Sequence, residues 1–125
     1  MAVAGFMLLL TACENDKFPI EVTVKDNVSF QLDIQPIFNQ QCVRCHTTMG
    51  MGMGVEPDLR NGYAYESLMD LPEGSIVPGD SEGSELMGML EWAEDSDNPM
   101  PPTTPISPLN IALVRKWIDE GAKNN

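Results

Sequence analysis

Two cysteines and a histidine stand close together in the stretch QQCVRCHTT, residues 40–48. This stretch contains His46, the only histidine of the chain, and two of its three cysteines, Cys42 and Cys45. The third cysteine is Cys13. This concentration of thiols beside an imidazole is typical of a redox pair, a metal site or the attachment of a prosthetic group. The surroundings of the motif decide between these three.

The first two alternatives lack the context that they need. A thioredoxin-like pair requires C-x-x-C at a strand-to-helix turn of a βαβ unit, and no parallel-sheet pattern surrounds this motif. A structural zinc ion takes four ligands, whereas the motif offers three and Cys13 is far along the chain. Both interpretations are therefore disfavoured.

Covalent attachment of haem is the third alternative, and Cys42-x-x-Cys45-His46 is its direct signature. Two cysteines one helical turn apart reach the two vinyl groups of the porphyrin and form thioethers. The adjacent His46 then binds the iron from one face. The sequence therefore predicts one covalent haem c.

The iron needs a ligand on its other face, and no second histidine is present. Methionine is the next choice and raises the reduction potential. Met100 lies in NPMPP, where flanking prolines keep the loop extended and stiff, so it is the favoured ligand. Its alternative role is that of an exposed loop residue. Of the other methionines, Met1 and Met7 belong to the expected signal. The rest lie close to the motif, as Met49, Met51 and Met53 do, or in expected helices where they fill core, as Met69, Met87 and Met89 do.

Size and charge limit the classes of partner. A chain of 125 residues fits one domain, and aromatic residues make up only 6% of it, so a bulky non-protein group could supply missing core volume. The net charge of −12 makes nucleic acid an unsuitable partner, because phosphate binding needs a basic face. An acidic surface favours docking on basic patches of redox proteins.

The N-terminal stretch predicts export. Residues 1–12, MAVAGFMLLLTA, are uncharged and resemble the apolar region of a signal peptide, too short to span a membrane. Leu10-Thr11-Ala12-Cys13 resembles a bacterial lipobox, in which Cys13 receives a lipid and becomes the mature N-terminus. The absence of an early Lys or Arg indicates an atypical signal or a true start upstream; an ordinary signal peptide is the alternative. We expect a periplasmic or cell-envelope protein, lipid-anchored at Cys13, with 13–28 as a tether containing one short strand at 20–24.

The remaining pattern is helical. Phe30, Ile34, Ile37 and Phe38 recur at helical spacing, and Asp33 as cap would place Pro36 in the first turn. Asp80 or Ser81 is expected to cap the third helix, and Ser107, Pro108 and Gly121 mark the start and end of the last one. The fold class is all-α, with about four helices joined by long loops. The expected helices are 33–42, 63–70, 81–93 and 108–120. In the third, the side chains expected to face inward are Leu86, Met89, Leu90 and Trp92. In the last, they are Leu113, Val114, Trp117 and Ile118.

With these elements in view, the stretch from about Ser29 to Gly121 resembles a small single-haem c-type cytochrome domain, close to the class I fold and most similar to planctomycete-type and related bacterial domains. The resemblance gives a cytochrome c domain at 29–125 and implies that Cys42 and Cys45 hold the haem, with His46 and Met100 as axial ligands. Phe38 and Trp117 should pack where the first and last helices cross. The matching segments are IQPIFNQQCVRCH, PDLR, YAYESLM, VPGDSEGSEL, MPP at 100–102 and the closing ISPLNIALVRKWIDEGA.

One segment departs from the family pattern. TTMGMGMG, residues 47–54, replaces the glycine and aliphatic residues usual after the motif. It is interpreted as a loop whose methionines cover a haem edge, with a Met-rich contact surface or a copper-attracting tract as alternatives.

The function implied is electron transfer by a non-enzymatic carrier, monomeric or in transient complexes with redox partners. Haem buried by Phe38, Leu68, Leu90 and Trp117 should have a fairly high potential. Two alternatives stay open at this point: a haem-binding docking module of a larger redox complex, and a five-coordinate haem gas sensor or enzyme.

Overall fold

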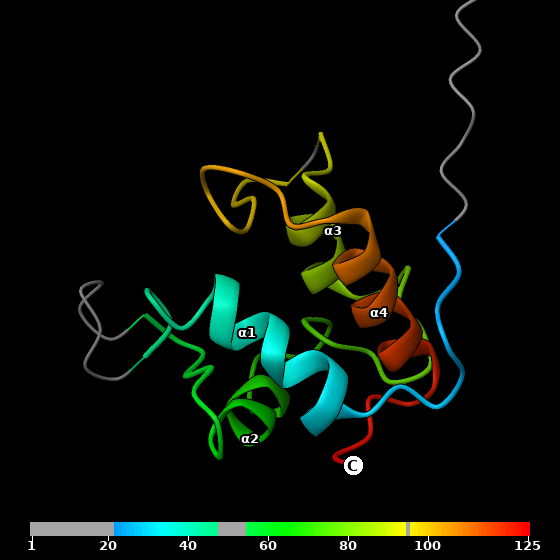
Figure 1. Ribbon diagram of the computed structural model, residues 1–125. Helices are drawn as coiled ribbons and strands as arrows, with labels where there is room; N and C mark the ends of the chain where they lie inside the picture. The colour runs from blue at the N-terminus through cyan, green and yellow to red at the C-terminus, as the bar shows by residue number, and fades with distance from the viewer. Residues whose placement is uncertain (1–21, 48–54, 95) are drawn as a thin grey trace, which may run out of the picture.

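The computed structural model describes residues 22–47, 55–94 and 96–125, and over these residues the protein is all-α, as predicted (Figure 1). A π-helical turn η1 (Phe30–Ile34) runs directly into α1 (Gln35–Gln41). Three further helices follow: α2 (Ala64–Met69), α3 (Glu85–Glu91) and α4 (Pro108–Asp119). The strand expected at 20–24 is wrong over 22–24, which has no regular structure, and its first two residues lie outside the described range.

The first helical segment begins at Phe30, three residues before the predicted start at 33. Its cap is Ser29, whose side chain accepts the N–H of Leu32 (3.2 Å), while the Asp33 carboxylate accepts the N–H of Ser29 (2.7 Å). This reciprocal pair works as a capping box does, so Asp33 stabilises the helix start from within. Pro36 has no N–H to donate to the preceding turn, and the π-helical turn ends just before it.

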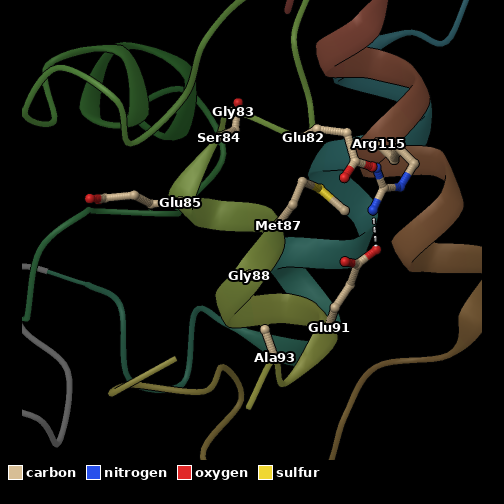
Figure 2. Close-up of a pocket in the computed structure, with 9 residues that line it drawn as sticks. All are labelled: Glu82, Gly83, Ser84, Glu85, Met87, Gly88, Glu91, Ala93 and Arg115. Carbon is tan, nitrogen blue, oxygen red and sulfur yellow. Dashed lines mark hydrogen bonds and ion pairs between the residues drawn. The ribbon is translucent and has the colours of Figure 1, made fainter. Parts of the chain in front are cut away.

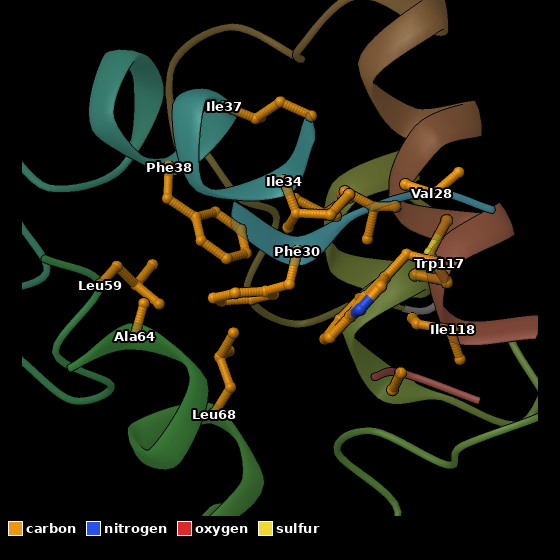
Figure 3. Close-up of a cluster of buried hydrophobic side chains, with 14 of the residues drawn as sticks. Val28, Phe30, Ile34, Ile37, Phe38, Leu59, Ala64, Leu68, Trp117 and Ile118 are labelled. Carbon is orange, nitrogen blue, oxygen red and sulfur yellow. The ribbon is translucent and has the colours of Figure 1, made fainter. Parts of the chain in front are cut away.

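Phe30 occupies the centre of the core. Its ring packs edge-on against Phe38 (centroids 6.1 Å apart) and Tyr65 (5.2 Å) and tilts on Trp117 (5.3 Å). Figure 3 shows Phe30 between Phe38 and Trp117. Phe38 and Trp117 are both buried, and each of them packs on the ring of Phe30. The expected junction of the first and last helices is therefore made by η1 against α4.

The closing helix α4 matches its prediction. The Ser107 side chain accepts the N–H of Asn110 (3.2 Å), Pro108 is the first helical residue, and Gly121 follows the helix with a left-handed φ of 99°. Proline there loses no helical hydrogen bond, and glycine adopts positive φ without strain. The buried residues of α4 are Val114, Trp117 and Ile118, and Leu113 is half-buried.

Helix α3 is shorter than predicted, because Ser84 and not Asp80 or Ser81 precedes its first residue. Asp80 instead organises a turn: its carboxylate accepts the N–H of Gly83 (2.9 Å), and its carbonyl accepts the hydroxyl of Ser84 (2.8 Å). The helix ends at Trp92, whose φ is 55°. Met87 and Leu90 are its buried residues, so Leu86, Met89 and Trp92 are less buried than expected.

The two ends of the described domain are hydrogen-bonded to each other. The carboxylate of Glu120 accepts the N–H groups of Asn27 (3.0 Å) and Val28 (2.8 Å). The backbone carbonyl of Asn125 accepts the N–H of Gln31 (3.0 Å) and the hydroxyl of Ser29 (2.7 Å). Val28, which is 2% exposed, therefore packs as part of the core cluster.

Candidate functional site

The Cys42-x-x-Cys45-His46 motif forms a single turn at the end of α1. Cys42 caps the helix, and its N–H donates to the carbonyl of Phe38 (2.9 Å). Its own carbonyl accepts the N–H groups of Cys45 (3.1 Å) and His46 (3.0 Å). The backbone therefore holds the two thiols one turn apart and the imidazole next to the second, as the sequence spacing predicts.

The two thiols have different environments. Cys42 packs half-buried against the core, Cys45 is exposed, and both are free thiols among the described residues. Burial, and secondarily the neighbouring Cys45, raises the pKa of the Cys42 thiol from 9.0 to about 11. Nucleophilic cysteines of disulfide exchange have lowered pKa values, so this environment argues against the thioredoxin-like alternative.

A chain of hydrogen bonds positions His46. Its carbonyl accepts the N–H of Leu59 (2.9 Å), and the carbonyl of Leu59 accepts the side-chain amide of Gln35 (3.0 Å). The backbone of Leu59 is thus hydrogen-bonded to the motif at His46. It is also hydrogen-bonded to the side chain of Gln35, the first residue of α1. The sequence pattern did not identify Gln35, a polar residue 3% exposed on the otherwise apolar inner face of α1.

The segment after that loop is fastened by Asp58. Its carboxylate pairs with the Arg60 guanidinium (2.6 Å), whose hydrogen bonds hold the pKa of the Asp58 carboxyl below its ordinary value. Asp58 also donates its N–H to the hydroxyl of Ser67 in α2 (2.7 Å), and Arg60 lies over the ring of Tyr63 at 4.8 Å. The PDLR residues therefore join the end of the loop to α2.

Met100 lies half-buried in the proline-rich segment between α3 and α4. Its N–H donates to the carbonyl of Met89 in α3 (2.9 Å). Met100 and Cys42 belong to the same set of half-buried apolar side chains that border the core. That set is Cys42, Val43, Tyr65, Leu71, Ile76, Leu86, Met100, Ile111 and Leu113.

These residues fit a covalent haem. The chain supplies two thiols at the required spacing, an imidazole next to the second, and a thioether in an anchored loop. In the described part of the chain, three buried polar side-chain atoms have no hydrogen-bond partner: Gln35 Oε1, His46 Nδ1 and Trp92 Nε1. Two of these atoms belong to Gln35 and His46, which the hydrogen bonds through Leu59 link.

The motif does not form a preassembled ion site. Within residues 22–47, 55–94 and 96–125, no three His, Cys, Asp or Glu side chains are placed to hold a metal ion. Cys13, Met49, Met51 and Met53 lie outside the described residues. In the part of the chain that the structure describes, no helix combines the length and apolar character needed to cross a bilayer.

A cavity of about 360 Å³ lies elsewhere, beside α3 and α4 (Figure 2). Arg115 of α4 reaches across it and forms ion pairs with Glu82 and Glu91. Its guanidinium also donates to the hydroxyl of Ser81 (3.2 Å). None of the motif residues lines this cavity. Arg115 links α4 to Glu91 at the end of α3 and to Glu82 in the turn before it, and α3 is the helix whose Met89 carbonyl accepts the N–H of Met100.

The chain was compared with protein families, curated proteins and solved structures. No family model matches the chain, and no curated protein matches it. Among solved structures, Kuenenia stuttgartiensis hydrazine synthase is similar over 76% of this chain, with a TM-score of 0.54 and 29% sequence identity. The similar region is 16% of the hydrazine synthase chain, so the present chain matches one segment of a much larger protein.

Proposed function

We propose that this chain is an electron-transfer module carrying one covalent haem c. Cys42 and Cys45 hold the porphyrin, and His46 and Met100 are the axial ligands of its iron. The observation that carries the proposal is the motif turn, in which the carbonyl of Cys42 accepts the N–H groups of both Cys45 and His46. When bound, haem supplies a centre that gains and loses one electron.

Each motif side chain has a defined task. Cys42 and Cys45 would hold the porphyrin through thioether bonds, whose formation from thiols and vinyl groups consumes no oxidant. His46 and Met100 would both bind the iron, which would leave no open position for a substrate. The chain would therefore transfer electrons and would not transform a small molecule.

The likeness to a segment of hydrazine synthase supports a role as a redox module within a larger assembly. The net charge of −12 favours a basic docking surface on the redox partner. Export and a lipid anchor at Cys13 complete the proposal and rest on the N-terminal sequence alone. Binding to a basic redox protein should weaken as salt rises, whereas binding that is insensitive to salt would contradict an electrostatic interface.

The direct test is to produce the protein together with haem-attachment machinery and to measure intact mass and absorption spectra. The wild type is expected to carry one porphyrin that survives denaturation, with a low-spin spectrum in both oxidation states. The double variant Cys42→Ser, Cys45→Ser should carry none, and Cys13→Ser is the matched control that should keep haem. A colourless wild type, or rapid carbon monoxide binding by the reduced wild type, would contradict the proposal.

A further inference from the structure

Two of the unpaired buried atoms are chemically complementary. Gln35 Oε1 is an acceptor, and it is buried without a partner among the described residues. His46 Nδ1 is also buried and unpaired there. If the other ring nitrogen of His46 binds iron, Nδ1 carries the proton and becomes a donor. One hydrogen bond between the two would satisfy both.

The amide of Gln35 is oriented by its surroundings. Its Nε2 donates to the carbonyl of Leu59 (3.0 Å) and to the side-chain oxygen of Asn39 (3.0 Å), which uses both of its hydrogens. The oxygen end is therefore the one that remains available. An amide flip would remove both bonds, so the assignment of oxygen and nitrogen follows from these contacts.

Gln35 and His46 lie on the same hydrogen-bond chain. Leu59 receives the Gln35 amide on its carbonyl and donates its N–H to the carbonyl of His46 (2.9 Å). Leu59 therefore links the Gln35 side chain to the backbone of His46, the residue whose ring nitrogen is unpaired. A buried polar group left unpaired destabilises the folded state, and a metal-bound histidine usually donates its second N–H to a fixed acceptor.

We propose that Gln35 is the positioning residue of the iron-binding histidine, accepting the Nδ1–H of His46 directly or through one water. This inference rests on the haem function proposed above. The bond would hold the ring orientation and place electron density on the imidazole, which favours oxidised iron. Gln35 would thus set the reduction potential without touching the iron.

The test compares three variants of the haem-loaded protein. Gln35→Met keeps the length of the side chain and removes both the Oε1 acceptor and the Nε2 donors. Gln35→Glu loses the same donors but supplies a stronger acceptor, so it separates the two effects. Gln40→Met changes an exposed glutamine of the same helix. The readouts are the reduction potential and, by NMR of the reduced protein, solvent exchange of the His46 ring N–H.

Gln35→Met is expected to raise the ratio of reduced to oxidised protein at fixed potential about tenfold, equivalent to 59 mV for one electron. The ring N–H should exchange faster, Gln35→Glu should shift the ratio in the opposite direction, and Gln40→Met should change neither. A wild-type potential and ring-proton exchange in Gln35→Met would overturn the inference. Where Gln35→Met fails to fold, an unshifted Gln35→Glu would overturn it. Absence of haem from the wild type would instead mark failure of the proposed function itself.

Discussion

The backbone N–H of Met100 donates a 2.9 Å hydrogen bond to the carbonyl of Met89, near the end of α3. The last carbonyls of a helix have no partner within it, so this bond satisfies one of them. Trp92, with φ of 55°, ends the helix and lets the chain turn away before it returns at Met100. The proposed iron ligand is therefore held by its backbone, independently of its side chain.

This separation makes Met100→Ala a specific test of ligation. The backbone bond to Met89 survives the substitution, so the loop should stay in place while the thioether is lost. The haem-loaded variant is expected to change from a low-spin to a high-spin spectrum and to lose any sulfur-to-iron charge-transfer band of the oxidised form. Met69→Ala, a half-buried methionine of α2, is the control and should keep both. An unchanged spectrum in Met100→Ala would exclude Met100 as a ligand.

The environments of the two thiols predict their reactivity in protein made without haem attachment. Because burial raises the pKa of Cys42 to about 11, its thiol stays protonated at neutral pH and resists alkylation. Cys45 is exposed and should be modified first, which peptide mass mapping after iodoacetamide treatment can measure. The reaction at Cys42 should accelerate as pH rises towards about 11. Equal rates at both cysteines at neutral pH would contradict this environment.

Phe30 should be the most sensitive core position of the first helical segment. Its ring contacts Phe38, Tyr65 and Trp117, so Phe30→Ala should lower the free energy of unfolding by about 3–5 kcal/mol. Leu32, two residues further on, is 76% exposed, and Leu32→Ala should change stability by less than about 0.5 kcal/mol. Urea unfolding of the two variants measures the difference. Similar losses in both would mean that Phe30 does not occupy the centre of the core.

The hydrogen bonds that the Glu120 carboxylate accepts between the two ends of the domain should be sensitive to acid. Hydrogen bonds from the N–H of Val28, then from Asn27, together with Lys116, hold the pKa of the Glu120 carboxyl below its ordinary 4.5. Because the pKa is lower in the folded state, this stabilisation is present above pH 4.5 and is lost as pH falls through the folded-state value. Glu120→Gln should therefore lower the melting temperature at neutral pH.

The comparison with pH separates this link from a general effect of charge. The difference between wild type and Glu120→Gln should shrink in acid, once the wild-type carboxyl is protonated. Glu73→Gln, at an exposed position, is the control and should melt as the wild type does at each pH. A difference that stays constant into acid would show that the carboxylate is not the group responsible.

Much of the site could be read from the sequence because its determinants are local. Cys42, Cys45 and His46 lie within one turn, and a turn is set by neighbouring residues. The same holds for α4, which begins with Ser107 and Pro108 and ends before Gly121, as capping chemistry predicts. The errors at the start of the first helix and in α3 also concern capping. Ser29 caps the first helical segment in place of Asp33, and Ser84 precedes α3 without a side-chain capping bond, in place of Asp80 or Ser81.

Tertiary structure alone decided the relationships between distant residues. Phe30 and Trp117 meet, Glu120 holds Asn27 and Val28, and Gln35 reaches Leu59 because helices pack in one arrangement of many that the pattern allows. Periodicity identifies which face of a helix is buried but not which residue it meets. Burial also decides the role of a polar group such as Gln35, because an amide needs hydrogen-bond partners within the protein only where water is excluded.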